Sequence, residues 1–134
     1  MIEETLVLIK PDAVKAGHIG DIITIYEKNK LEIVKMRMLK MTKETAAKHY
    51  EEHIGRPYYE SLEEFMTSGK IVAFVLKGEG AIDKVREING KTDPNEAADG
   101  TVRKLYAESK QHNAVHASDS PENAKREINI FFGE

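Results

Sequence analysis

Two short, uninterrupted apolar runs constrain the fold of this chain most strongly. They cover residues 5–10 (TLVLIK) and 71–76 (IVAFVL). Runs of this length, rich in β-branched residues and without polar alternation, are typical of strands that are buried on both faces. We therefore expect both runs to be central strands of one sheet.

The segments around these runs indicate which elements accompany the central strands. Helical spacing of apolar residues predicts helices over about 20–29, 42–53, 81–89 and 121–132, with a short helix after Pro57. Alternation predicts a half-exposed strand over 31–41, and residues 113–117 (NAVHA) form a short last strand. The long polar connection over 90–112 is of a kind that is usually functional or disordered.

This order of elements describes a ferredoxin-like α+β domain, a βαββαβ sandwich with helices packed on an antiparallel sheet. No glycine-rich loop follows the first strand, which disfavours a Rossmann or P-loop fold. A length of 134 residues suits a single domain over 1–134.

Charge and cysteine content exclude several classes of function. The net charge is −3 and the 20 Lys and Arg residues are scattered, so neither nucleic acid nor a membrane surface is an expected partner. The chain has no cysteine, which excludes a disulfide framework, a thiol nucleophile and a cysteine-ligated zinc. The chain has no basic leader and no apolar run of membrane-spanning length, so we expect a cytoplasmic protein.

The segment from His49 to His53 (HYEEH) matches the inverted zinc-protease pattern H-x-x-E-H. Histidines four positions apart on a helix share one side and can share a metal. The pattern is short, however, and no third ligand follows nearby. We therefore favour a solvated helix face for both histidines and expect no metal held by the protein.

His116 is the stronger candidate for chemistry. It lies in an apolar strand just before Ser120 and Pro121, an N-cap followed by a residue suited to the first helical position. Glu127 lies on the edge of the apolar stripe of the helix that follows. A carboxylate that accepts from one imidazole nitrogen leaves the other free as a nucleophile. The pattern also suits a core histidine satisfied by a carboxylate, and spacing alone leaves both interpretations open.

Three cations are candidates for binding an anion. Lys10 ends the first buried strand, Arg86 precedes the long polar connection, and Arg103 lies within it. Arginine offers a fork of donors that suits phosphate oxygens, and Thr92 adds a hydroxyl. Each cation alone is better explained as a surface charge. Together with a candidate nucleophile they suggest phosphate chemistry.

Five segments give the chain a specific family resemblance. In order they are 9–14 (IKPDAV), 56–59 (RPYY), 92–94 (TDP), 100–103 (GTVR) and 113–120 (NAVHASDS). From about Thr5 to Phe132 the sequence resembles nucleoside diphosphate kinases, and the last segment is close to the active-site signature of that family.

The resemblance implies an enzyme that transfers the terminal phosphate of a nucleoside triphosphate, mainly ATP, to a nucleoside diphosphate. The route would be ping-pong through a phosphohistidine at His116. Glu127 and Ser118 would support its ring, and Mg²⁺ would bridge phosphate oxygens. The remaining implied roles are phosphate binding by Lys10, Arg86, Thr92 and Arg103, contacts near the ribose 3′-hydroxyl by Lys10 and Asn113, base stacking by Tyr58, and a place near the phosphates for Tyr50.

The resemblance also implies a homo-oligomer, a tetramer or a hexamer, and leaves the preferred nucleotide open. Three departures from the family pattern stand out: Ala117 replaces the usual glycine, Asp93 replaces an asparagine, and Lys110 stands where a small apolar residue commonly covers the base. A ligand-sensing module is the alternative, because the ferredoxin-like fold serves that purpose too and fold does not fix function.

Overall fold

The computed structural model describes residues 1–133, and in this part of the chain four strands form one antiparallel sheet. Their order across the sheet is β2-β3-β1-β4. The strands are β1 (Ile2–Ile9), β2 (Glu32–Lys40), β3 (Lys70–Glu79) and β4 (Val115–Ala117). The two apolar runs are thus confirmed as the central strands, and the ferredoxin-like arrangement of the elements is confirmed with them.

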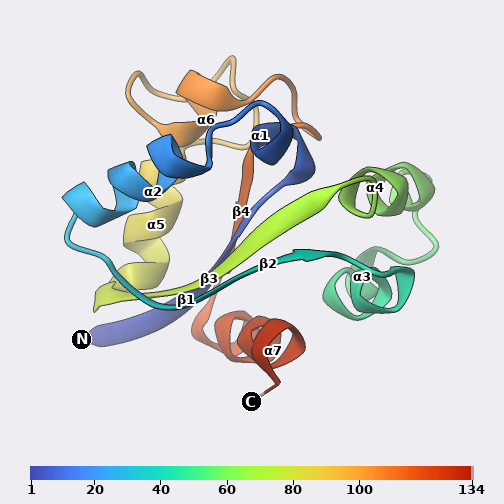
Figure 1. Ribbon diagram of the computed structural model, residues 1–134, viewed down its shortest axis with the longest axis horizontal. Helices are drawn as coiled ribbons and strands as arrows, with labels where there is room; N and C mark the ends of the chain where they lie inside the picture. The colour runs from blue at the N-terminus through green and yellow to red at the C-terminus, as the bar shows by residue number, and fades with distance from the viewer. Residues whose placement is uncertain (134) are drawn as a thin grey trace.

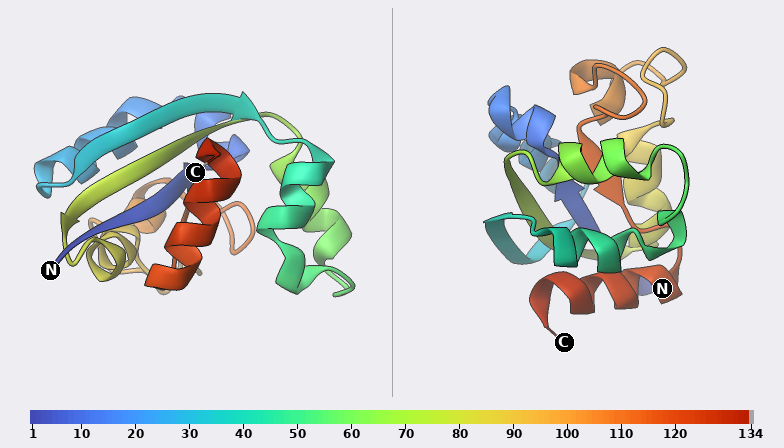
Figure 2. Two further views of the ribbon diagram at one scale, coloured as in Figure 1. Left: turned by 90° about the horizontal axis from the view of Figure 1, so that it is seen from below. Right: turned by 90° about the vertical axis from the view of Figure 1, so that its right-hand side faces the viewer.

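Helices cover both faces of the sheet (Figure 1). On one face pack α1 (Pro11–Lys15), α2 (Ile19–Lys28) and α5 (Ala81–Asn89), with α6 (Val102–Tyr106) beside them. On the other face pack α3 (Lys43–His49), α4 (Tyr59–Met66) and α7 (Pro121–Phe132). Figure 2 shows α3 and α4 side by side at one end of the sheet. None of the helices described here is long and apolar enough to cross a membrane.

Successive side chains of the central strands point to opposite faces of the sheet, so the protein has two hydrophobic cores. Val7 and Ile9 of β1 face α2 and α5, where Tyr26 and Val85 are fully buried. Leu6 and Leu8 face the opposite core, which holds Met41, Met66 and Phe131. A strand that is buried on both faces has apolar side chains at every position, which explains the uninterrupted run.

Local signals place the boundaries of several helices. The Ser120 side chain accepts from the backbone N–H of Asn123 and starts α7 at Pro121, as the sequence predicts. The Thr42 side chain accepts from the N–H of Thr45 and starts α3. The predicted helix over 42–53 is too long, because α3 ends at His49 and a short 3₁₀ turn, Glu51–His53, follows it.

Two short helices lie where the sequence predicts none. Pro11 marks the end of β1 but also occupies the first position of α1, where its missing N–H costs nothing. In the long connection, the Thr101 side chain accepts from the N–H of Lys104 and caps α6. Each of these helices has five residues, which is too short to show a helical repeat.

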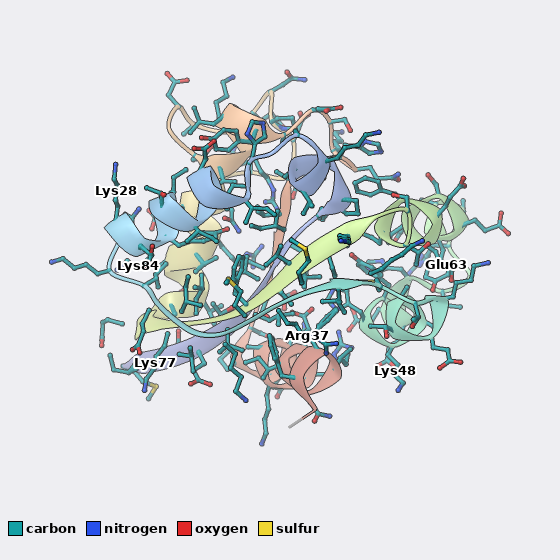
Figure 3. All side chains as sticks on the ribbon, viewed as in Figure 1. Lys28, Arg37, Lys48, Glu63, Lys77 and Lys84 are labelled. Atoms are coloured by element: carbon teal, nitrogen blue, oxygen red, sulfur yellow. The ribbon has the colours of Figure 1, made fainter. Side chains whose placement is uncertain are left out.

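β2 is an edge strand of the sheet, and three of its apolar side chains are exposed. Val34, Met36 and Met38 are 39%, 56% and 51% exposed. On the same strand the Arg37 guanidinium donates to the carbonyl of Phe131 at 2.9 Å, which ties the strand to the end of α7. Figure 3 shows the Arg37 side chain beside that helix, whereas Lys28, Lys77 and Lys84 extend away from the sheet.

Candidate active site

The His116 ring lies between a buried carboxylate and open space. β4 pairs with β1 and places His116 opposite Leu8, with the side chain 24% exposed. The Nε2 atom lies 3.1 Å from each carboxylate oxygen of Glu127, a residue of α7 that is 4% exposed. The hydroxyl of Ser118 donates to Oε1 of the same carboxylate at 2.6 Å.

This arrangement fixes the charge of Glu127 and the tautomer of His116. Burial alone would raise the pKa of the Glu127 carboxyl, but the hydrogen bonds from His116 and Ser118 and the charge of His116 outweigh it and lower the pKa. An ionised carboxylate only accepts hydrogen bonds, so Nε2 of the neutral ring carries the proton. The lone pair therefore lies on Nδ1.

A large open cleft of about 1500 Å³ lies beside the ring. Seven of the ten predicted site residues line it: Lys10, Tyr58, Arg86, Thr92, Arg103, Asn113 and His116. They come from β1, β4, the start of α4, α5 and the long connection, and the fold brings them together. Of the other three, Ser118 and Glu127 contact each other behind His116, and Tyr50 is described below.

Lys10 follows the last residue of β1, and its ammonium is held inside the protein. Nζ donates to Oδ1 of Asn113 at 2.7 Å, and the side-chain amide of Asn113 donates to the carbonyl of Thr92 at 3.4 Å. Burial and the nearby Arg103 charge lower the pKa of Lys10 to about 8, against the opposing effect of Asp12. The cleft thus has a cation at its base that titrates close to physiological pH.

Arg103 and Arg86 differ in how they are held. The Arg103 guanidinium donates from Nη1 to the carbonyl of Gly90 at 2.8 Å and from Nη2 to that of Val115 at 2.9 Å. It therefore clamps the long connection to β4. Arg86 and Thr92 are exposed on the cleft wall.

Tyr58 supplies an aromatic surface at the mouth of the cleft. Its side chain is 47% exposed, and its hydroxyl forms a hydrogen bond with Nδ1 of His53. Leu62 and Lys110 line the same cleft, and a place for Lys110 over the base stays a prediction.

His49 contradicts the expectation of a solvated helix face. It is 4% exposed, and its ring packs edge-on against that of His116, with the centroids 4.7 Å apart. It does not pair with His53, because α3 ends at His49 and His53 turns towards Tyr58. Sequence spacing could not show this position, since the partners of His49 come from β4 and α7.

Tyr50 is buried next to His49 rather than in the large cleft. The two rings meet edge-on with centroids 4.4 Å apart, and the Tyr50 hydroxyl has no hydrogen-bond partner within residues 1–133. Tyr50 lines a smaller cleft, to which His49, His116 and Glu127 also belong. A contact between Tyr50 and phosphates stays a prediction.

Asp12 is a residue of the site to which sequence reasoning gives no role. Its Oδ2 accepts from the backbone N–H of Ala114 at 3.1 Å, while the N–H of Lys10 donates to the carbonyl of Ala114 at 2.8 Å. Ala114 has a φ of 72°, a conformation that L-residues rarely adopt. The only signal in the sequence is that Asp12 belongs to the first of the five resembling segments.

Comparison with known proteins gives one consistent result. The family model for nucleoside diphosphate kinase matches residues 3–134. The chain is 53% identical over 133 residues to the nucleoside diphosphate kinase of Campylobacter fetus subsp. fetus, covering 99% of this chain and 97% of that protein. It is 51% identical over 134 residues to that of Methanocaldococcus jannaschii, covering 100% and 96%.

Solved structures agree with the sequence comparisons. A crystal form of the Aquifex aeolicus nucleoside diphosphate kinase superposes with a TM-score of 0.96 at 43% identity, covering 98% of this chain and 96% of that one. The Halobacterium salinarum enzyme in complex with CDP superposes with a TM-score of 0.95 at 39% identity, covering 100% and 90%.

Proposed function

The chain belongs to the nucleoside diphosphate kinase family, and from that premise we propose how its own residues perform the transfer. The activity is movement of the terminal phosphate from a nucleoside triphosphate to a nucleoside diphosphate. The comparisons do not favour a ligand-sensing module. The observation that carries the proposal is the His116 ring, whose Nε2 faces Glu127 and which lines the cleft together with three cations.

The first half of the reaction forms a bond between Nδ1 of His116 and the terminal phosphorus. The bond from that phosphorus to the bridging oxygen breaks, and the diphosphate leaves with the electron pair. The ring then carries a positive charge, and the Glu127 carboxylate stabilises it through Nε2–H. In the second half an oxygen of the acceptor diphosphate attacks the phosphorus, and the P–N bond breaks. One site thereby serves donor and acceptor in turn.

The cleft supplies the charges that phosphoryl transfer needs. Catalysis of this reaction rests on in-line positioning and on cations around the phosphate oxygens. Lys10, Arg86 and Arg103 provide the cations, and the Thr92 hydroxyl adds a donor. Lys10 and Asn113, joined by a hydrogen bond, are placed to contact the region of the ribose 3′-hydroxyl.

Tyr58 stacks on the base in this proposal. Its half-exposed ring is available at the cleft mouth. Every base has an aromatic face, so stacking lets the site accept different bases rather than select one. The CDP complex of the Halobacterium salinarum enzyme supports nucleotide binding as the use of the cleft.

The side chains of the cleft fit a Mg²⁺ ion that arrives on the nucleotide. Mg²⁺ takes oxygen ligands, chiefly phosphates and water, and the carboxylates lining the cleft are Glu87, Glu96 and Asp119 rather than a closed cage. The ion would therefore be held mainly by phosphate oxygens. It draws negative charge away from the phosphates, which complements the lysine and arginine side chains.

A homo-oligomer, a tetramer or a hexamer, is part of the same proposal. β2 is an edge strand with an unpaired side and three exposed apolar side chains, a surface that a second copy of the chain would cover. The mass in solution, measured by light scattering, tests it, and Met36→Lys should lower that mass. We also propose a cytoplasmic location, where a nucleotide-exchanging enzyme meets its substrates.

The decisive experiment is labelling with ATP that carries ³²P in its terminal phosphate. The wild type should retain an acid-labile, base-stable label after desalting, and His116→Ala should retain none and show no exchange. His18→Ala is the matched control, because His18 lines neither cleft beside His116. Label retained by His116→Ala would overturn the assignment.

A further inference from the structure

A second, smaller cleft of about 150 Å³ lies beside His116 where its Nε2 faces Glu127, and it shares His116 with the lining of the nucleotide cleft. We call it the rear cleft. It is lined by residues of α3, β4 and α7, among them His49, His116, Glu127 and Arg126. The proposed phosphoryl transfer takes place at Nδ1, whereas Nε2 faces Glu127, which lines the rear cleft.

His49 is the unexplained residue of the rear cleft. Within the described chain, neither of its ring nitrogens has a hydrogen-bond partner, although both are buried. A neutral imidazole ring has one nitrogen with a free lone pair, and that is the form of histidine that binds metals.

Three ligand atoms converge in the rear cleft. Nε2 of His116 lies 3.1 Å and Nδ1 of His49 lies 3.7 Å from Oε2 of Glu127, and the three residues offer ligand atoms that all lie within 4.8 Å of one another. A tetrahedral zinc with bonds of about 2.0–2.1 Å holds its ligand atoms about 3.4 Å apart. The 3.1 and 3.7 Å distances of the two histidine nitrogens from Oε2 lie on either side of that value.

The surroundings of Glu127 also suit a ligand. Ser118 occupies Oε1, so the carboxylate is oriented by an outer hydrogen bond and presents Oε2 to the two histidines. Two imidazoles and one carboxylate with a fourth position open to the rear cleft form a donor set that zinc accepts. This set is not the H-x-x-E-H pair, since His53 has no part in it.

We propose that His49, His116 and Glu127 form a Zn²⁺ site, and that zinc bound there blocks phosphorylation of His116. The metal takes the lone pair of Nε2, so the proton that this nitrogen donated to Glu127 moves to Nδ1. A protonated Nδ1 has no lone pair with which to attack phosphorus. Zinc thus inhibits by binding Nε2 rather than the nitrogen that attacks phosphorus.

The positive charge of Arg126 lowers the affinity of the site for zinc. Nη2 of Arg126 lies 3.9 Å from Oε2 of Glu127, and its guanidinium is fixed by the carbonyls of Lys48 and His49. Its positive charge weakens the attraction of the carboxylate for zinc. The site is therefore one of reversible occupation rather than one for a resident cofactor. Binding rests on the geometry alone, and inhibition rests on the proposed role of His116.

Zinc titration of the full-length protein, without nucleotide or Mg²⁺, tests the binding. Calorimetry should show one zinc per chain in the wild type. His49→Phe keeps an aromatic ring and removes no hydrogen bond. It should bind zinc at least roughly 10-fold more weakly, because mutation of a residue that only supports a metal ligand already lowers metal affinity by that factor. His18→Gln, which removes a histidine elsewhere, should bind like the wild type. Equal affinity of the wild type and His49→Phe would overturn the proposal.

A measurement on the wild type alone covers the case in which His49→Phe fails to fold. Nitrogen-15 NMR of the His116 ring should show the proton on Nε2 without zinc and on Nδ1 with one equivalent of zinc. An Nε2 proton that persists at zinc saturation would refute the site, whatever the protein's activity. ³²P labelling after zinc preincubation tests inhibition: the wild type should lose its label, and His49→Phe should keep its own zinc-free level. Equal loss in both would refute inhibition through this site.

Discussion

Replacement of Glu127 by glutamine isolates what the buried carboxylate contributes to transfer. The substitution keeps the size of the side chain and removes its charge. In the wild type two donors converge on the carboxylate, Nε2–H of His116 at 3.1 Å and the Ser118 hydroxyl at 2.6 Å. Glutamine offers one acceptor oxygen and an NH₂ group. Either one donor loses its partner, or the His116 ring accepts from the amide and moves its proton to Nδ1.

The expected magnitude follows from the charge on the phosphorylated ring. A hydrogen bond to a charged group contributes about 1.5–3 kcal/mol. Each 1.36 kcal/mol lost from the transition state slows a step about tenfold, so Glu127→Gln should slow phosphoenzyme formation roughly 10- to 150-fold. Nucleotide affinity should change little, because Glu127 does not line the nucleotide cleft.

The assay is the rate of ³²P incorporation from saturating ATP in a rapid-quench instrument. Glu122→Gln, on an exposed position of the same helix, is the control for charge removal and should label at the wild-type rate. A Glu127→Gln rate within about threefold of the wild type would refute the reasoning, because the carboxylate would then stabilise no charge on the ring.

The same variant has a signature in stability against pH. The lowered pKa of Glu127 means that its charged form stabilises the fold, so this contribution is complete above about pH 4.5 and is lost as the pH falls through the lower, folded pKa. The difference in free energy of unfolding between the wild type and Glu127→Gln should shrink over that acidic range.

Three further predictions concern the nucleotide cleft. Arg103→Lys should lower the free energy of unfolding by about 1–3 kcal/mol and also slow transfer, because one ammonium cannot bridge the carbonyls of Gly90 and Val115. An unchanged midpoint of urea unfolding would contradict this prediction. ADP affinity, measured by calorimetry, should weaken as the pH rises through about 8, where Lys10 loses its charge, and Lys10→Gln should show no such inflection. Lys110→Val should bind ADP more tightly than the wild type, with the chemical step unchanged, because the lysine ammonium prefers water to a position over the base. Equal or weaker binding by Lys110→Val would show that the lysine stem covers the base or that its ammonium contacts a phosphate.

How much of this molecule the sequence predicts depends on whether the signal is local. α5 begins and ends at the predicted residues because the apolar spacing along 81–89 lies within the helix itself. The end of α3 is different, since Tyr50 leaves the helical conformation where it enters a core built by distant segments. The five resembling segments contain six of the seven predicted residues that line the cleft, all but Arg86, but they give no distances between them.

His49 shows the same limit within the site. In the sequence alone, His49 is one of two histidines in a charged segment, which is typical of a solvated position. Its burial depends on β4 and α7, which bring His116 and Glu127 against it from the other end of the chain. No period or motif within 43–53 carries that information, so the rear cleft is visible only in three dimensions.

Ala114 shows why such places resist prediction from local preference. Alanine favours the right-handed helical region, yet here it has a φ of 72°, which costs free energy. Asp12 and the N–H of Lys10 hold its backbone from both sides, and the kink brings Asn113 to within 2.7 Å of the Lys10 ammonium. The same kink starts β4 at the register that turns His116 towards Glu127. The contacts that offset this backbone strain also assemble the cleft. The local preference of alanine therefore does not predict the conformation of Ala114.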